Sequence, residues 1–203
     1  MYIERPRVAE KRAYLALKRA FDISGALVGL AVLALPMSVI ALIIALDSPG
    51  DPIFRQERLG KDGKPFTMYK FRSMCQDAER DGPRWADADD VRCTRFGAFL
   101  RRTRLDELPQ IWNILKGDMS FVGPRPERAC FYRMFEEYIV GFSNRLAVTP
   151  GLTGYAQVNG GYDLKPEEKI VYDMEYIERR SVWMDLLCIL KTIRVVFCGD
   201  GAR

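Results

Sequence analysis

The 203-residue sequence contains no histidine. This absence excludes catalysis by a histidine general base, the Ser-His and Cys-His nucleophile systems, and metal sites with imidazole ligands. Any chemistry must therefore depend on the side chains of Asp, Glu, Lys, Arg, Tyr or Cys.

Cysteine is scarce and scattered. The sequence has five cysteines, an odd number, and none of them forms a Cys-x-x-Cys pair. Such a set excludes a disulfide framework or a zinc site and is typical of reduced thiols in the cytosol. The five positions are Cys75, Cys93, Cys130, Cys188 and Cys198.

Basic charge is concentrated at the N-terminus, and the rest of the chain is electrically balanced. Residues 1–19 hold six of the 31 basic residues and two of the 27 acidic ones, which leaves 25 of each sign for residues 20–203. A nucleic-acid binder usually spreads basic charge over its folded part, so we expect no nucleic-acid partner. A basic arm directly before an apolar segment favours anionic membrane lipid instead.

Charge is missing altogether between Asp22 and Asp47. The 24 uncharged residues 23–46 exceed the roughly 20 that a membrane-spanning helix requires. No small-residue cleavage site before a polar region marks a signal peptide. A buried core helix is the alternative, but core helices of this length normally keep a polar face.

The flanking charges of this segment conflict with a single membrane crossing. Basic residues lie on both sides, in residues 11–19 and 55–64, and the positive-inside rule assigns both flanks to the cytoplasm. Pro36, near the middle, removes one helical hydrogen bond and favours a kink, and Ser38 can help to satisfy the freed backbone groups. We therefore predict a re-entrant helix over residues 20–47 that breaks at Pro36 and returns to the same face.

Two extended arms follow the apolar segment. Residues 53–59 and 64–74 flank an Asp-Gly turn and predict a short hairpin or extended strands. In the second arm, Lys70 and Arg72 are two residues apart and project from one side of a strand, where a pair of cations can clamp a phosphate. A solvated strand face is the alternative interpretation.

An acidic pair, Asp106 and Glu107, lies shortly after three arginines at positions 101, 102 and 104. Pro109 and the apolar spacing of residues 108–115 predict a helix that begins near the pair and ends at Gly117. The free N–H groups and the dipole of a helix N-terminus stabilise negative charge. Neighbouring helical side chains point about 100° apart, so one carboxylate can face a substrate while the other holds a metal. An exposed, charged helix start is the alternative.

Two stiff or turn-rich loops follow this helix. Pro124 and Pro126 fix the backbone on both sides of Arg125, so the loop presents the guanidinium for a bidentate phosphate or base contact. Residues 149–160 form a second loop, rich in glycine.

Two helices are predicted near the C-terminus, over residues 166–180 and 182–197. The second is apolar on most sides. We expect its burial in the core, with a position in the membrane interface as the alternative.

Taken together, these motifs resemble the bacterial sugar transferase family, the monotopic phosphoglycosyl transferases. The resemblance covers roughly residues 18–197 and rests on the order of six motifs. They are KRAFD at 18–22, the Pro-broken apolar segment, YKFRSM at 69–74, LDELPQ at 105–110, GDMSFVGPRP at 117–126 and PGLTG at 150–154.

The resemblance implies a helix-rich α/β fold in the minimal form of the family. We expect a basic arm (1–19), the re-entrant membrane helix (20–47) and a compact cytosolic catalytic domain (48–203) on the cytoplasmic face of the bacterial inner membrane. The implied reaction moves a sugar-1-phosphate from a nucleotide diphosphate sugar, expected to be a UDP-sugar, to a polyprenyl phosphate such as undecaprenyl phosphate. Its product would start polysaccharide or glycoconjugate assembly.

The resemblance also implies roles for the candidate site residues. Asp106 would be the nucleophile and Glu107 a ligand of Mg²⁺. The residues that would contact the substrate phosphates or nucleotide are Lys70, Arg72, Arg101 and Arg125, with Pro124 and Pro126 beside the last.

The chain departs from the family pattern at one position. Many relatives have Asn-Gly-Arg where this chain reads Asn159-Gly160-Gly161. An arginine contact in that loop, and any sugar preference tied to it, therefore do not carry over. The sequence leaves open the sugar, the polymer and whether the chain forms a homodimer.

The implied chemistry is physically reasonable without histidine. A carboxylate nucleophile and a lipid phosphate are both already anions, so neither attack requires removal of a proton. The approach of anions to a diphosphate requires positive charge, which Mg²⁺, the arginines and a helix terminus would supply. A membrane-attached site also meets a lipid acceptor at the bilayer surface.

Two other classes of function compete with this interpretation. A membrane-attached glycosyltransferase would form a glycosidic bond and release a nucleoside diphosphate, whereas sugar-phosphate transfer releases a monophosphate. A non-catalytic scaffold of a polysaccharide assembly complex would bind a donor without turnover. Such a scaffold would be free to lose Asp106 and Glu107, and their presence beside Arg125 in the family motifs favours an enzyme.

Overall fold

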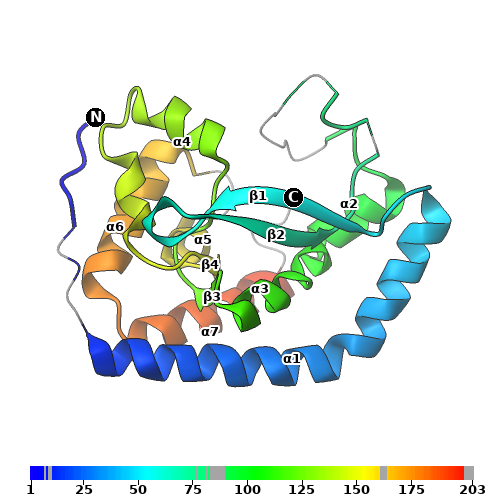
Figure 1. The fold of residues 1–203 in the computed structure, drawn as a ribbon, viewed down its shortest axis with the longest axis horizontal. Helices are drawn as coiled ribbons and strands as arrows, with labels where there is room; N and C mark the ends of the chain where they lie inside the picture. The colour runs from blue at the N-terminus through cyan, green and yellow to red at the C-terminus, as the bar shows by residue number, and fades with distance from the viewer. Residues whose placement is uncertain are drawn as a thin grey trace.

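One long helix, α1 (Arg12–Asp47), runs along the edge of a helix-rich α/β domain (Figure 1). The computed structural model describes residues 1–6, 8, 11–75, 77–80, 82, 90–160 and 164–198. The strands are β1 (Ile53–Leu59), β2 (Pro65–Phe71), β3 (Ser120–Val122) and β4 (Gly151–Thr153). The other helices are α2 (Arg95–Arg102), α3 (Gln110–Lys116), α4 (Ala129–Glu136), α5 (Tyr155–Gly160), α6 (Pro166–Arg179) and α7 (Val182–Cys198), with 3₁₀ turns η1 (Lys61–Gly63), η2 (Leu105–Glu107) and η3 (Phe142–Ala147).

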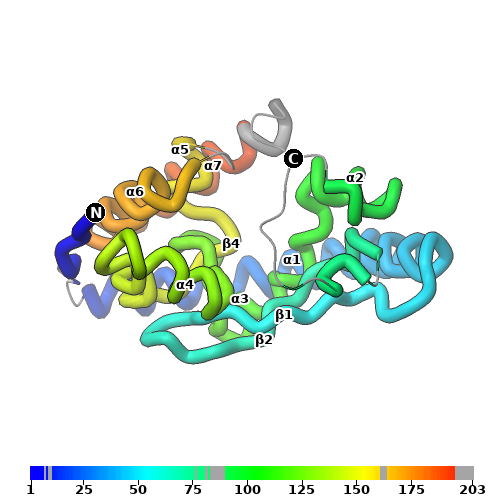
Figure 2. Tube along the Cα trace, turned by 90° about the horizontal axis from the view of Figure 1, so that it is seen from above, coloured from blue at the N-terminus to red at the C-terminus, as the bar shows by residue number. Residues whose placement is uncertain are grey.

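Two small sheets organise the domain. β1 and β2 pair antiparallel from Ile53 opposite Phe71 to Leu59 opposite Pro65, which confirms the predicted hairpin. β3 and β4 form a second, parallel pair. Figure 2 shows the hairpin and the helices α5 to α7 on opposite sides of the domain, with β4 between them. The helix-rich α/β prediction is therefore confirmed.

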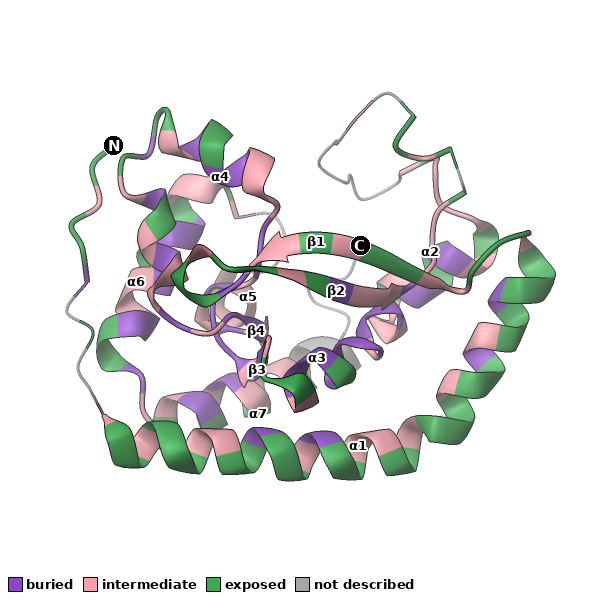
Figure 3. Cartoon of the chain, viewed as in Figure 1, coloured by how far each residue is buried: buried purple, intermediate pink, exposed green. Residues whose placement is uncertain are grey.

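Helix α1 is continuous through Pro36 and bends well before its C-terminal end, so that its last turns rise toward the start of β1 (Figure 1). Ser38 Oγ donates a hydrogen bond to the Ala34 carbonyl oxygen at 2.9 Å, a side-chain contact that commonly bends helices. Most of the outer face of α1 is exposed (Figure 3). Its exposed apolar side chains include Leu27, Val28, Val32, Leu35, Val39, Leu42 and Leu46.

The length and composition of α1 are sufficient to cross a membrane, and no other helix in the described part of the chain meets that test. A long apolar helix with an exposed outer face supports association with a membrane. The re-entrant path over residues 20–47 and the boundaries of the basic arm remain predictions.

The charged motif at the start of α1 attaches this helix to the domain. Lys18 Nζ forms an ion pair with Asp185 of α7 at 3.0 Å. Arg19 donates from Nη1 and Nη2 to the carbonyl oxygens of Ile114 and Leu115, each at 2.7 Å. These carbonyls lie at the C-terminal end of α3, where a helix has no backbone partners for them and a positive charge is favourable.

Asp22 makes a second attachment from the same motif. It is only 4% exposed, and its Oδ1 accepts hydrogen bonds from Ser120 Oγ and the Phe121 N–H, both at 3.0 Å. A charged side chain inside the apolar interface of α1 therefore has two donors from β3. The KRAFD motif therefore joins α1 to the rest of the domain.

Apolar packing completes the joint between α1, α3 and the hairpin. The buried residues of this cluster are Ala26, Met68, Ile111, Ile114 and Met119. Trp112 lies within the apolar stretch of residues 108–115 that predicted this helix, but it is 49% exposed.

Helix α7 differs from its predicted burial. Ser181 caps its start, because the Met184 N–H donates to Ser181 Oγ at 3.3 Å. Cys188 is fully buried, but Trp183 and Leu190 are 75% and 62% exposed. The expectation of a helix buried in the core is therefore wrong for the outer face, which remains apolar and exposed.

The Asp22→Ala substitution tests the joint between α1 and β3. It leaves the Phe121 N–H and the Ser120 hydroxyl without their acceptor, which costs about 1–3 kcal/mol in the free energy of unfolding. We expect a lower denaturation midpoint for the chain in detergent. Ser24→Ala is the control, because Ser24 donates only to the Phe21 carbonyl of its own helix among the described contacts. Equal midpoints for the two variants would contradict the attachment.

Candidate active site

The acidic pair lies on the turn η2, directly before α3. Arg104, the residue before η2, adopts a left-handed conformation with φ 59°, which turns the chain sharply. Asp106 and Glu107 are each only 7% exposed, so the alternative of an exposed helix start is wrong. Helix α3 begins at Gln110, and the pair therefore precedes the α-helix instead of occupying its first turn.

Two cations from different motifs hold this pair. Lys70 Nζ lies 3.0 Å from Glu107 Oε1 and 3.8 Å from Asp106 Oδ2. Arg125 bonds Glu107 through both terminal nitrogens, with Nη1 at 3.3 Å from Oε2 and Nη2 on Oε1. The structure therefore brings together four of the predicted site residues around a bidentate Arg–carboxylate contact.

The surroundings drive the pKa values of the two carboxyls apart. Burial raises the pKa of Asp106, Lys70 opposes this effect, and the charge of Glu107 adds to it. Burial also raises the pKa of Glu107, but Arg125 and Lys70 outweigh it and hold that pKa well below its usual range. Glu107 is thus a fixed anion, whereas Asp106 is a more basic carboxylate, a division of roles typical of active sites.

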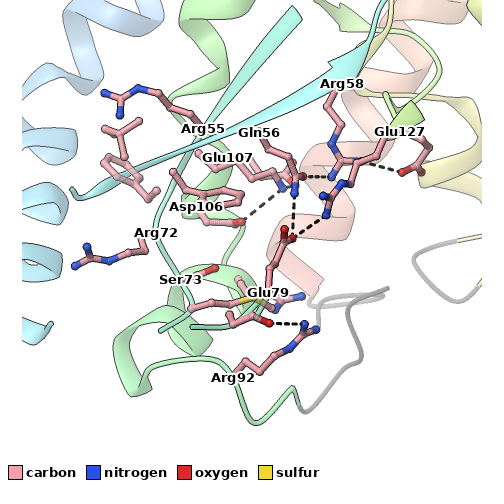
Figure 4. Close-up of a pocket in the computed structure, with 18 of the residues that line it drawn as sticks. Arg55, Gln56, Arg58, Arg72, Ser73, Glu79, Arg92, Asp106, Glu107 and Glu127 are labelled. Carbon is pink, nitrogen blue, oxygen red and sulfur yellow. Dashed lines mark hydrogen bonds and ion pairs between the residues drawn. The ribbon is translucent and has the colours of Figure 1, made fainter. Parts of the chain in front are cut away.

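The pair opens into a cavity of about 500 Å³, which is within the range of small-molecule sites. Figure 4 shows Arg55 and Arg72 on the side of the cavity toward α1, and Arg58 and Glu127 on the other side. Most of the charged lining residues are basic, which suits an anionic ligand.

The loop that carries Arg125 is held at every carbonyl. The carbonyl oxygens of residues 124, 125, 126 and 127 accept hydrogen bonds, in that order, from Gly151 N (2.9 Å), Arg145 Nη2 (3.0 Å), Arg58 Nη1 (3.3 Å) and Leu59 N (3.1 Å). The two prolines of this loop predicted its stiffness, but its clamps come from three distant segments. A loop fixed at four successive positions presents Arg125 in one orientation.

Glycines let the two turn-rich loops approach backbone to backbone. A Cβ atom on Gly151 would lie 2.1 Å from the Gly123 nitrogen, and one on Gly154 would lie 2.1 Å from the Gly123 oxygen. Since real Cβ atoms do not approach so closely, only glycine fits at these positions. The Gly-Pro-Arg-Pro and Pro-Gly-Leu-Thr-Gly motifs therefore form one structural unit.

Arg72 and Arg101 line the cavity but have other bonds. Arg72 donates to the carbonyl oxygens of Ser48 at 2.6 Å, Asp51 at 2.9 Å and Ile44 at 3.3 Å, so it closes the C-terminal end of α1. Arg101 Nη1 donates to Cys93 Sγ at 3.1 Å. Direct substrate contact by these two arginines remains a prediction.

Sequence reasoning missed the residues that support the site. Arg145 is 1% exposed, and its Nε donates to Asp173 Oδ2 at 2.6 Å while Nη2 holds the Arg125 carbonyl. Glu127 pairs with Arg58 at 3.1 Å. Isolated charged residues far apart in the sequence carry no pattern that would have revealed these pairs. The predicted departure at Gly161 lies outside the described residues.

The carboxylates of the site can bind Mg²⁺ only if substrate phosphates complete its coordination. Within the described ranges, no group of three or more His, Cys, Asp or Glu side chains is placed to hold a metal. The carboxylates of Asp106 and Glu107 both line the cavity, and Mg²⁺ commonly binds one or two carboxylates together with substrate phosphates. Oxygen ligands of this kind are compatible with such an ion.

Comparison with known proteins gives consistent similarities. A family model described as bacterial sugar transferase matches residues 13–199. The UDP-N-acetylgalactosamine-undecaprenyl-phosphate N-acetylgalactosaminephosphotransferase of Aeromonas hydrophila is 44% identical over 94% of this chain. A putative undecaprenyl-phosphate N-acetylgalactosaminyl 1-phosphate transferase of Bacillus subtilis is 57% identical over 68% of it. The UDP-glucose:undecaprenyl-phosphate glucose-1-phosphate transferase of Escherichia coli is 43% identical over 92%.

The matches cover different shares of the relatives' own lengths. The chain spans 46% of the Aeromonas protein and 41% of the Escherichia protein, but the match covers 78% of the Bacillus protein. The similarity therefore concerns less than half of two of these three relatives.

Replacing Arg145 tests the support of the Arg125 loop. Arg145→Met leaves Asp173 buried without its ion pair and removes the donor to the Arg125 carbonyl, so we expect a loss of about 3–5 kcal/mol in the free energy of unfolding. Arg179→Met is the control, because its pair with Glu175 is exposed and should contribute less than about 1 kcal/mol. Chemical denaturation in detergent measures both. Similar losses in the two variants would show that Arg145 has no special structural role.

Proposed function

The chain belongs to the bacterial sugar transferase family, and we propose that it transfers a sugar-1-phosphate from a UDP-sugar to undecaprenyl phosphate. The observation that carries this proposal is the buried Asp106–Glu107 pair, which Lys70 and Arg125 hold at the wall of a basic cavity. The printed names of the relatives, which include UDP-sugars and undecaprenyl phosphate as substrates, support the choice of donor and acceptor. The product would start the assembly of a polysaccharide or glycoconjugate.

In the proposed first step, an Asp106 carboxylate oxygen attacks the phosphorus that bears the sugar. The bond from this phosphorus to the bridging oxygen of the diphosphate breaks, and UMP leaves with the electron pair. The protein then carries an acyl phosphate that holds the sugar. The raised pKa of Asp106 favours this role, because a more basic carboxylate is a stronger nucleophile.

In the second step, an oxygen of undecaprenyl phosphate attacks the same phosphorus. The acyl phosphate bond breaks, the Asp106 carboxylate is restored, and the sugar is left on a lipid diphosphate. Both attacking groups are anions at neutral pH, so neither step requires a general base. A mechanism without a general base agrees with the absence of histidine from the chain.

The carboxylate, the diphosphate and the lipid phosphate are all anions, so the proposed reaction requires positive charge to offset their repulsion. Lys70 and Arg125 lie at the acidic pair and would bind the phosphoryl oxygens as negative charge develops. Glu107, kept ionised by these cations, is the residue that would hold Mg²⁺. When bound, the ion supplies additional positive charge at the phosphates.

The membrane helix gives the proposed reaction its location. We propose that α1 re-enters the cytoplasmic face of the bacterial inner membrane, with anionic lipid near the basic arm. The apolar outer face of α1 and the bend toward β1 support this arrangement. Because Arg72 joins the end of α1 to the cavity, the lipid phosphate would arrive close to Asp106.

The Asp106→Asn variant provides the decisive test. Purified protein in nanodiscs receives Mg²⁺, undecaprenyl phosphate and a panel of UDP-sugars, and the released nucleotide is identified. We expect the wild type to release UMP and the variant to lose at least about a thousandfold in rate, because the nucleophile is missing. Without acceptor, intact-mass measurement should find a sugar-phosphate adduct on the wild type alone.

The matched control is Asp62→Asn. Asp62 is an exposed aspartate in the hairpin turn, where its φ of 57° suits asparagine equally well. UDP instead of UMP as product would identify a glycosyltransferase. Donor binding by a folded wild type without any nucleotide release would favour a scaffold.

Chelation tests the proposed ion separately. We expect EDTA to stop UMP release and added Mg²⁺ to restore it, because the carboxylates and the diphosphate repel one another without it. Glu107→Gln should raise the Mg²⁺ concentration required for half-maximal activity. Full activity in EDTA would contradict the assignment of Mg²⁺.

A further inference from the structure

Gln157 carries a hydrogen-bonding group that the proposed chemistry does not use. It lies on α5, the short helix that directly follows the Pro-Gly-Leu-Thr-Gly motif, and it lines the cavity. Its Nε2 donates to the Leu152 carbonyl oxygen at 3.0 Å, which fixes the orientation of the amide. Its Oε1 is buried and has no hydrogen-bond partner among the described residues. A buried acceptor without a donor is costly unless a ligand supplies one.

One part of the cavity wall is polar and contains both signs of charge. Lys169 Nζ lies 3.6 Å from Glu127 Oε1, and Arg58 Nη1 lies 3.1 Å from Glu127 Oε2. Arg58, Glu127 and Lys169 line the cavity together with Gln157. Closely spaced donors and acceptors suit a neutral ligand with many hydroxyl groups better than they suit a second phosphate.

The geometry of the two proposed displacements separates the sugar from the other substrates. In phosphoryl transfer the attacking and leaving oxygens lie roughly in line through phosphorus. UMP therefore leaves from the face opposite Asp106, and the lipid phosphate attacks along the same line. The oxygen that bears the sugar neither enters nor leaves, so it lies to one side of that line and directs the sugar into another part of the cavity.

The position of α1 decides which part of the cavity remains for the sugar. Arg72 binds the carbonyl of Ser48 just beyond α1, and Figure 4 shows Arg55 and Arg72 on the side toward α1. A lipid acceptor reaches the cavity from that side. Arg58 and Glu127 lie on the other side (Figure 4), where Lys169 pairs with Glu127.

We propose that Gln157 determines donor-sugar specificity by accepting a hydrogen bond from a hydroxyl or acetamido N–H of the sugar. Glu127 and Lys169, which line the same cavity, would complete this sugar subsite. The assignment rests on the proposed function, since it uses the in-line geometry of sugar-phosphate transfer. A site built to bind a particular hydroxyl or N–H rejects a sugar that lacks it far more strongly than an apolar wall does.

The test compares four donors that differ only at C2 and C4: UDP-glucose, UDP-galactose, UDP-N-acetylglucosamine and UDP-N-acetylgalactosamine. Gln157→Met keeps the side-chain length but removes the acceptor. We expect the ratio of kcat/KM between the preferred donor and its C2 or C4 analogue to fall by about tenfold or more. Inhibition by UMP should stay unchanged, because UMP has no sugar beyond its own ribose.

Asn159→Leu is the matched control on the same helix. Its amide bonds the Tyr155 carbonyl and the Lys191 ammonium and is not among the residues that line the cavity. Its donor ranking should equal that of the wild type. If Gln157→Met fails to fold, Gln157→Asn withdraws the amide by one methylene and should change the ranking in the same direction.

The outcomes distinguish failure of this inference from failure of the proposed function. If the wild type releases UMP and the Gln157 variants lose activity equally with all four donors, or bind UMP more weakly, the specificity role is overturned and the function stands. If the wild type releases no UMP with any donor, both fall. A changed donor ranking with unchanged UMP inhibition supports the sugar subsite.

Discussion

The attraction of Lys70 and Arg125 for the buried Glu107 is the interaction on which the site depends. A carboxylate that is 7% exposed remains ionised only because two cations lie against it. Lys70 belongs to β2, Glu107 to η2 and Arg125 to the loop after β3, so one cluster fixes three segments. The neighbouring Asp106 has the longer contact with Lys70, 3.8 Å against 3.0 Å for Glu107, which suits its proposed role as nucleophile.

The support of this cluster comes from backbone contacts as much as from side chains. Arg58 and Arg145 use their guanidinium groups to hold carbonyls of the Arg125 loop, and the close glycine contacts at Gly123 and Gly151 join that loop to β4. Because these bonds fix the backbone of the loop, the Cα atom of Arg125 is held in place and only its side-chain torsions can vary. Precise placement of a guanidinium is what a phosphate ligand requires.

Local signals in the sequence predicted much of this structure. The Asp-Gly turn identified the hairpin, the apolar stretch of residues 182–197 identified α7, and the acidic pair identified the site. Long-range contacts could not be predicted, because Arg19 and Asp22 bind groups 95 to 99 residues away, in two cases a backbone carbonyl. A carbonyl has no sequence signature, so neither these partners nor that of Arg145 could be identified. The left-handed Arg104 likewise turns the chain just before the acidic pair, so the pair lies on η2 and not in the first turn of the predicted helix.

The attachment of α1 at both ends has a mechanical consequence. Arg19 fixes its first part to α3, and Arg72 fixes its last turn beside β2. A free helix adapts to a thicker or thinner bilayer by tilting on its own. Here any tilt of the proposed membrane helix must tilt the whole domain with it. The height of the acidic pair above the lipid headgroups would therefore vary with acyl-chain length. Bilayer thickness would thus change the distance between the proposed active site and the lipid phosphate.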